Sequence, residues 1–197
     1  MNLDSHDIKS FAAYAERLSN VLTTSSWGGV SLLARDMQQA WLNGRQVFFC
    51  GNGGSAGNAI HLANDFIYGV AKQTGCGIKA VALSANSAVM TCLANDVGYD
   101  HIYSEQLAVL GDPGDVLVVL SGSGNSPNIL KALECAKQKK IKTYAILGFS
   151  GGQAMKLADE AIHFPVEDMQ IAEDMQLVVG HMLMQWLYAN RPVHQSS

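Results

Sequence analysis

Two pairs of ionisable residues have spacings that could support chemistry. His61 and Asp65 lie four positions apart, so a helix would place both side chains on one face. Glu173 and His181 lie eight positions apart, close to two helical turns, in a segment that is otherwise strongly apolar. Two histidines and two carboxylates match the ligand chemistry of a divalent transition metal. Hydrogen-bonded core or interface histidines and a solvated acidic helix end are the alternative interpretation.

A loop of small residues at 121–130, SGSGNSPNIL, could hold a phosphate group. Pro127 suits the first position of a helix, and Ser126 suits the N-cap before it. The hydroxyl groups of Ser121 and Ser123 precede that helix. Together with backbone N–H groups and the positive end of the helix dipole, these hydroxyls would form a phosphate cradle. A tight turn that only needs glycine and a serine cap is the alternative.

A second small-residue loop lies at 50–59, CGNGGSAGNA. Its glycines at 51, 53 and 54 leave room beside the backbone, and Asn52 supplies an amide that can bond hydroxyl groups. It lacks the lysine of a P-loop and the acidic residue that follows a dinucleotide-binding G-x-G-x-x-G, so neither nucleotide motif is favoured. Because neither loop contains a basic residue, a small phosphorylated polyol is the better ligand.

Five short apolar runs predict the strands that position these loops. Each run is apolar at consecutive residues, which is typical of strands covered on both faces. Helix-length segments separate the runs, and this alternation predicts an α/β fold with a doubly wound parallel five-stranded sheet. Ligands of such sheets bind at the carboxyl ends of the strands, where both loops lie. The predicted strands are 46–50, 79–83, 115–120, 142–147 and 160–164, and the predicted helices are 55–70, 87–95, 102–110, 126–139, 151–158 and 168–189.

The segment before the first strand predicts an N-terminal helical pair. Residues 6–43 carry two apolar stripes at helical spacing, separated by SSWGG. These helices must bury their apolar faces on the core or on another subunit. A chain of 197 residues without an obvious linker is expected to form one domain over 1–197, with helices in 1–43 and an α/β core in 44–190.

Composition excludes several classes of partner. Hydrophobic residues make up 48% of the chain, charged residues 15%, and the net charge is −4, so a nucleic-acid surface is not expected. No apolar run approaches the roughly 20 residues of a membrane span, so no membrane partner is expected. The four cysteines lack C-x-x-C spacing, and the polar N-terminus does not resemble a signal peptide. These features favour a cytoplasmic protein.

Four segments in order resemble the SIS-domain sugar-phosphate isomerases, and among them the phosphoheptose isomerases. They are CGNGGSAGNAIHLANDF, CLANDVGYDHIYSEQL, GDVLVVLSGSGNSPNILKALECAK and IAEDMQLVVGHML, and the likeness covers about residues 8–190. The resemblance implies a flavodoxin-like SIS domain and a homotetramer with active sites between subunits. It also implies that the substrate is a small phosphorylated sugar, with sedoheptulose 7-phosphate isomerised to glycero-manno-heptose 7-phosphate. The product would be used in the biosynthesis of lipopolysaccharide or another surface heptose.

The resemblance also implies roles for individual residues. Asp65 would be the catalytic base and His181 the acid, and one zinc ion per subunit would be held by His61, Asp65, Glu173 and His181. The residues implied in substrate binding are Asn52, Gly53, Gly54, Ser55, Asn95, Asp96, Ser121, Gly122, Ser123, Ser126 and Glu173.

The chain departs from the family pattern at its acidic positions. The family has glutamate where this chain has Asp65, and glutamine where it has Glu173; the usual Q-E-x-H run reads E-D-M-Q at 173–176. The added negative charge at Glu173 is expected to hold a divalent cation more tightly. A SIS protein that binds a partner without catalysis, such as the replication-initiator-associating type, and a phosphosugar-binding module are the alternatives. The chemically competent side chains of His61, Asp65 and His181 favour the enzyme.

Overall fold

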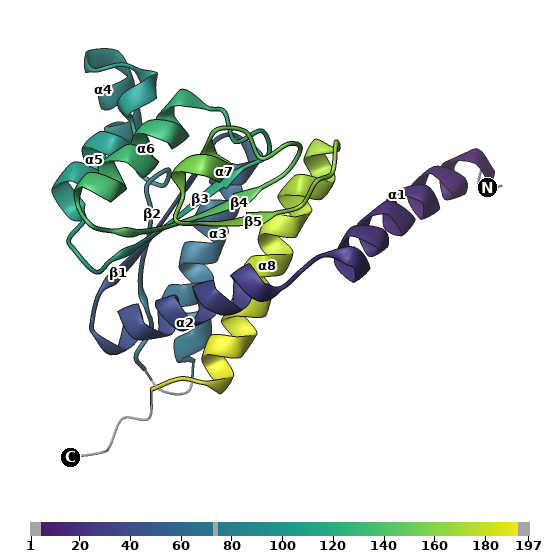
Figure 1. Ribbon diagram of the computed structural model, residues 1–197, viewed down its shortest axis with the longest axis horizontal. Coiled ribbons are helices and arrows are strands. Elements are labelled where there is room, and N and C mark those ends of the chain that lie inside the picture. Colours follow the sequence, from purple (N-terminus) through teal and green to yellow (C-terminus); the bar gives the residue numbers. More distant parts are fainter. Residues whose placement is uncertain (1–4, 73–74, 193–197) are drawn as a thin grey trace.

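The computed structural model describes residues 5–72 and 75–192, and its centre is one five-stranded parallel sheet (Figure 1). The strand order is β2-β1-β3-β4-β5, and every neighbouring pair is parallel. This confirms the predicted sheet. The strands are β1 (Gln46–Gly51), β2 (Lys79–Ala82), β3 (Val116–Ser121), β4 (Lys142–Leu147) and β5 (Glu160–His163).

Helices cover both faces of the sheet, which explains why the strand sequences are apolar at consecutive positions. Alternate residues of β3 point to opposite faces: Val118 packs in one core cluster and Val119 in the other. One face is covered by α2 (Gly28–Leu42), α3 (Gly54–Ile67), η1 (Gly69–Ala71) and α8 (Met169–Ala189). The other is covered by α4 (Ser87–Asp96), η2 (Tyr99–His101), α5 (Ser104–Leu110), α6 (Pro127–Gln138) and α7 (Ala154–Leu157).

Several helix ends differ from the sequence-based prediction. The helix predicted over 55–70 ends at Ile67 and continues as the 3-10 turn η1. The helix predicted over 151–158 shrinks to α7, because Gly151 and Gly152 have φ values of 77° and 56°, outside the right-handed helical region. The sheet and the order of elements are unaffected by these differences.

The two predicted N-terminal helices are present and differ in their packing. Helix α2 lies against the sheet and α8, whereas α1 (Ser5–Thr24) extends away from the rest of the molecule (Figure 1). The second half of α1 packs Leu18, Val21 and Leu22 against the core. Two polar contacts also join α1 to the start of α8: Tyr14 donates a hydrogen bond of 2.5 Å to Asp174, and Arg17 pairs with Asp168 at 3.2 Å. The bond to Asp174 is the main cause that raises the pKa of Tyr14 to about 12. Phe11 on α1 is 72% exposed.

No helix within the described ranges is both long and apolar enough to cross a membrane.

The two small-residue loops lie side by side because β1 and β3 are neighbours in the sheet. Gly51, at the end of β1, pairs in register with Leu120 near the end of β3. The chain enters α3 at Gly54 and α6 at Pro127, so both helix N-termini face the same edge. The fold therefore brings together two loops that lie about seventy residues apart in sequence.

One glycine of the loop at 121–130 is required by packing rather than by a ligand. Gly124 has φ +66°, and a Cβ atom there would overlap the carbonyl oxygen of Gly151 in the loop after β4. Only glycine satisfies both conditions, because other residues are strained at positive φ and carry a Cβ.

We expect Gly124→Ala to lower the free energy of unfolding by about 2–4 kcal/mol, from left-handed strain and steric overlap. Urea denaturation would measure the loss. Gly57→Ala is the matched control: it lies within α3 with no atom within 4 Å of the added Cβ, so we expect a gain of about 0.5–1 kcal/mol. Equal stabilities of the two variants would contradict this account of Gly124.

Candidate active site between helices α3 and α8

Three ionisable side chains converge between α3 and α8. His61 and Asp65 come from α3 and His181 from α8. The Nε2 atoms of the two histidines are 3.0 Å apart, and Asp65 Oδ2 lies 3.4 Å from His61 Nε2 and 3.6 Å from His181 Nε2. The histidine side chains are about half exposed, whereas that of Asp65 is 17% exposed. We call these three residues the His–Asp–His cluster.

A close approach of the two helices brings the cluster together. Gly180 lies next to His181, and Leu62 lies next to His61. A Cβ atom on Gly180 would overlap the side chain of Leu62, so the absence of a side chain at position 180 allows the helices to approach. Leu62 is buried at 1% exposure, which fixes its position in the core. The glycine–leucine contact therefore sets how closely the helices that carry the histidines approach.

The cluster has the donor set of a divalent metal site. The ligand atoms of its three residues all lie within 4.8 Å of one another. Two imidazole nitrogens at 3.0 Å can share only one proton between them, so at least one of them presents a lone pair. Two imidazoles and a carboxylate are ligands of Zn²⁺ and related ions. These residues therefore fit a transition metal.

Glu173, the fourth predicted ligand, lies elsewhere in this structure. Its carboxylate covers Gly54 at the start of α3, where a Cβ atom would overlap both of its oxygens. Eight residues along α8 separate Glu173 from His181, a rise of about 12 Å. The structure thus joins three of the four predicted ligands and places the fourth at the glycine loop.

The side chain of Asn52 is tied to the neighbouring loop. Asn52 and Asn128 exchange two amide hydrogen bonds of 2.9 Å each, and the Tyr99 hydroxyl donates to Asn52 Oδ1 at 3.1 Å. The Tyr103 hydroxyl donates to the carbonyl of Gly51. Burial raises the pKa of Tyr103, so its phenol remains a donor at neutral pH. One N–H of Asn52 remains for a ligand.

The serine loop has the predicted helix start but not the predicted cap. Ser126 is the N-cap of α6 and Pro127 is its first residue, yet the Ser126 hydroxyl makes no capping bond. Ser121 is buried, and its hydroxyl accepts a 3.0 Å bond from the N–H of Gly124. Ser123 accepts a weaker 3.3 Å bond from the N–H of Asn125. Ser123 and Ser126, both partly exposed, are therefore the hydroxyls best placed for a ligand.

The other glycines and serine predicted to bind substrate differ in whether free space lies beside them. Gly53 has φ +56° and no atom within 4 Å of an added Cβ, so space is open beside its backbone. Gly122 is covered by Met169, the first residue of α8. Ser55 is buried at 3% exposure and accepts a hydrogen bond from Gln176. Of these positions, Gly53 has the free space that a ligand needs.

Asn95 and Asp96 end α4 and bond to each other. Asn95 donates to Asp96 at 2.7 Å, and the Cys92 thiol donates to the same carboxylate at 3.4 Å. The Asn95 bond is the main cause that lowers the pKa of Asp96. Tyr99, three residues beyond Asp96, is the residue of this segment that contacts Asn52.

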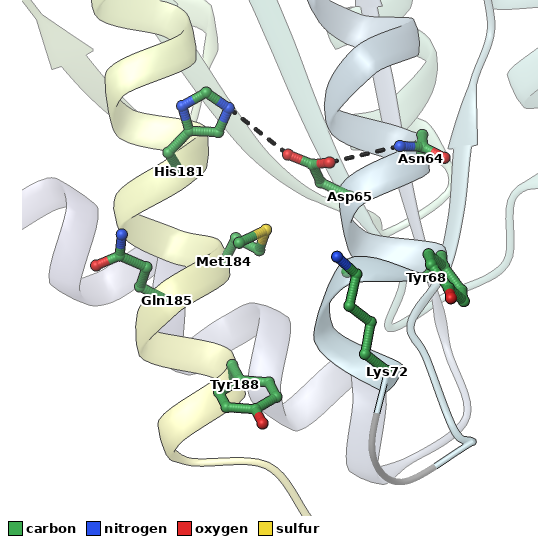
Figure 2. A pocket seen from close by; sticks show the side chains of 9 residues that line it. Asn64, Asp65, Tyr68, Lys72, His181, Met184, Gln185 and Tyr188 are labelled. Carbon is green, nitrogen blue, oxygen red and sulfur yellow. Dashed lines mark hydrogen bonds and ion pairs between the residues drawn. The ribbon is translucent and has the colours of Figure 1, made fainter.

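A cavity of about 580 Å³ opens between α3 and α8 beside the cluster (Figure 2). Asp65 and His181 form one end of its lining, and Lys72 reaches toward it from beyond η1. Among the described lining residues, Lys72 is the one lysine or arginine. Sequence reasoning missed Asn128 and Tyr99, because their partner Asn52 is distant in sequence. It also missed Lys72, which no motif marks.

We expect Asn128→Ala to lower the free energy of unfolding by about 1–3 kcal/mol, because it removes both hydrogen bonds of the pair and leaves the half-buried side-chain N–H of Asn52 without its acceptor. Chemical denaturation would measure the change. Asn95→Ala, an exposed asparagine at the end of α4, is the control and should stay within about 0.5 kcal/mol of the parent chain. A neutral Asn128→Ala would show that the amide pair does not hold the loops together.

Comparison with known proteins identifies the family. A family model described as SIS domain matches residues 10–148. The phosphoheptose isomerase of Rhodospirillum rubrum is 41% identical over 140 residues, which cover 71% of this chain and 74% of that protein. The phosphoheptose isomerase of Helicobacter pylori is 35% identical over 178 residues, which cover 89% of this chain and 90% of that protein.

Solved structures agree with the sequence relatives. A phosphoheptose isomerase from Francisella tularensis has a TM-score of 0.87 and 25% identity, and covers 95% of this chain and 100% of its own. The phosphoheptose isomerase GmhA from Neisseria gonorrhoeae has a TM-score of 0.80 and 29% identity, and covers 90% of this chain and 97% of its own. The chain therefore belongs to the SIS-domain family, and within it to the phosphoheptose isomerases.

Proposed function

We propose that this chain is an aldose–ketose isomerase that converts sedoheptulose 7-phosphate into glycero-manno-heptose 7-phosphate. The observation that carries the proposal is the convergence of Asp65 with His61 and His181 on two facing helices, one of which begins at the glycine loop. The relatives named phosphoheptose isomerase support the choice of substrate.

The reaction moves a proton between C1 and C2 of the sugar through an enediol. The Asp65 carboxylate removes a proton from C1 while protonated His181 donates a proton to the carbonyl oxygen on C2. The enediol then takes a proton at C2 from Asp65 and returns the proton of the C1 hydroxyl to His181, which leaves an aldehyde at C1. The two residues end in their starting protonation states. Their 3.6 Å separation lets both reach adjacent atoms of one substrate.

We propose that His61, Asp65 and His181 hold one zinc ion per subunit, with Glu173 as a fourth ligand if its side chain turns toward the cluster. A histidine that binds zinc has no proton on its coordinating nitrogen, so with zinc bound the ion would polarise the carbonyl oxygen in place of protonated His181. Asp65 can serve both purposes because its oxygens differ in surroundings. Oδ2 faces the histidines, whereas Oδ1 lies 3.5 Å from the amide of Asn64 and remains available as the base.

The serine loop is the proposed phosphate cradle. Ser123 and Ser126 offer hydroxyls at the N-terminus of α6, whose dipole favours an anion. Beside it, Asn52 and the open backbone at Gly53 are proposed to contact the sugar hydroxyls. Gly54, Ser55, Ser121, Gly122 and Glu173 would shape the site through their packing, and Asn95 and Asp96 would reach it only after a movement of α4.

We also propose an oligomeric state, a cellular location and a pathway for this chain. A homotetramer of single-domain, cytoplasmic chains would cover the exposed apolar residues of α1, among them Ile8 and Phe11. It would also cover the groove between α2 and α8 that Trp27, Met182 and Trp186 line. The product would enter the synthesis of lipopolysaccharide or another surface heptose.

We expect the purified chain to isomerise sedoheptulose 7-phosphate, and Asp65→Asn to lower kcat by about 10²–10⁴-fold, because the amide cannot accept the proton. A coupled assay with and without zinc would measure both. Asp100→Asn, an exposed aspartate of η2, is the control and should keep its kcat within about twofold. An unaltered kcat in Asp65→Asn would remove Asp65 as the base. Binding of the sugar phosphate without turnover, with or without zinc, would instead favour the phosphosugar-binding module.

We expect Ser123→Ala and Ser126→Ala each to raise KM for the sugar phosphate about tenfold, because each loses one hydrogen bond to a charged group. The same assay measures this effect, and kcat should change less than KM. Ser87→Ala, at the exposed start of α4, serves as the matched control with KM unchanged. An equal KM in all three variants would place the phosphate elsewhere.

A further inference from the structure

A buried polar bridge joins α3 to α8 next to the His–Asp–His cluster. Gln176 on α8 is 1% exposed and donates a 3.0 Å hydrogen bond to the Ser55 hydroxyl on α3. Asn58 on α3 donates to Gln176 Oε1 at 2.9 Å and to the backbone carbonyl of Glu173 at 3.0 Å. The three side chains therefore make bonds in both directions between the helices. We call Ser55, Asn58 and Gln176 the polar bridge.

The bridge lies close in sequence to the metal-site residues on both helices. Asn58 precedes His61 by three positions, and Gln176 precedes His181 by five. The Gly180–Leu62 contact sets how closely the helices approach. That contact is apolar and without direction, so it restrains sliding along the helix axis less than hydrogen bonds do. A slide of one residue would move His181 by about 1.5 Å relative to His61.

A metal site tolerates much less than this displacement. Functional constellations need their groups held within about 0.5 Å, and the partners behind the ligands supply that precision. Leaving a bridge partner unpaired inside the core also costs free energy, so the bonded arrangement is strongly preferred. The bonds of Gln176 satisfy both ends of its amide in one register of α3 against α8.

We propose that Gln176 is a positioning residue that fixes the register of α3 against α8 and so sets the divalent-cation affinity of the His–Asp–His cluster. This inference rests on the metal site of the proposed function. Gln176 acts through Ser55 and Asn58 and contacts neither substrate nor metal. It stands at the last position of the E-D-M-Q run, where the family pattern has histidine, so this bridge is a property of this chain's own residues.

The test measures Co²⁺ binding to the full-length chain after metal removal, by the visible absorption of the bound ion and by competition with a chelator. We expect Gln176→Leu to weaken Co²⁺ binding by about tenfold, the lower end of the loss that follows removal of a residue bonded to a metal ligand, because Gln176 acts on the ligands only through the helix register. Its absorption spectrum should also change, because the coordination geometry changes. Gln170→Leu, an exposed glutamine in the first turn of α8, is the matched control and should bind within about twofold of the parent chain.

A second variant keeps the test decisive if Gln176→Leu does not fold. Asn58→Ala removes two of the three bridge bonds and should give a similar loss of Co²⁺ affinity. In the double variant the losses should not add, since both substitutions break one network. Thermal unfolding of the metal-free variants shows whether the fold persists.

Each outcome decides one of the two proposals. Parent-like Co²⁺ affinity and spectrum in folded Gln176→Leu or Asn58→Ala would overturn the positioning role alone. A parent chain that isomerises the sugar phosphate but does not bind Co²⁺ would overturn the metal site and this inference with it. A parent chain that binds Co²⁺ without isomerising the sugar, while the bridge variants lose affinity, would support the inference and contradict the proposed function.

Discussion

The close approach of α3 to α8 at Gly180 is the contact on which the rest of the site depends. Helix α8 carries no side chain at position 180, so Leu62 of α3 packs directly against the backbone of α8. His61 and His181 flank the contact and are brought to 3.0 Å. Two half-exposed imidazoles would otherwise separate into solvent, because a bond between exposed polar groups contributes little free energy. The apolar packing of Leu62 against Gly180 supplies the restraint, and the two histidines lie at the edge of this contact.

A pair of side-chain hydrogen bonds connects the two loops at the edge of the sheet. The reciprocal amide pair of Asn52 and Asn128 ties the loop after β1 to the first turn of α6. The proposed sugar contacts and the proposed phosphate contacts thus belong to one bonded unit rather than to two independent loops. The helix pair and the loop pair share α3, which begins in the first loop and carries His61 and Asp65. A ligand held at the loops is therefore held relative to the acid–base groups.

Most of the fold could be predicted from the sequence, because it depends on local patterns. Consecutive apolar residues identified the strands, and the i, i+4 spacing placed His61 and Asp65 on one face. The meeting of His181 with that face depends on Gly180 packing against Leu62, a pair more than one hundred residues apart in sequence. The Asn52–Asn128 pair likewise joins residues that are distant in sequence. Glu173 matched a ligand pattern, but its carboxylate covers Gly54 because the start of α8 faces the glycine loop.

Helix α8 links the outermost part of the molecule to its reactive centre. Near its start, Asp168 and Asp174 hold α1, which stands away from the body (Figure 1). Further along, the same uninterrupted helix carries His181 and then one wall of the cavity. A helix of 21 residues is a rod of about 32 Å that bends little. A displacement of α1 by a neighbouring molecule would therefore be transmitted along α8 to His181.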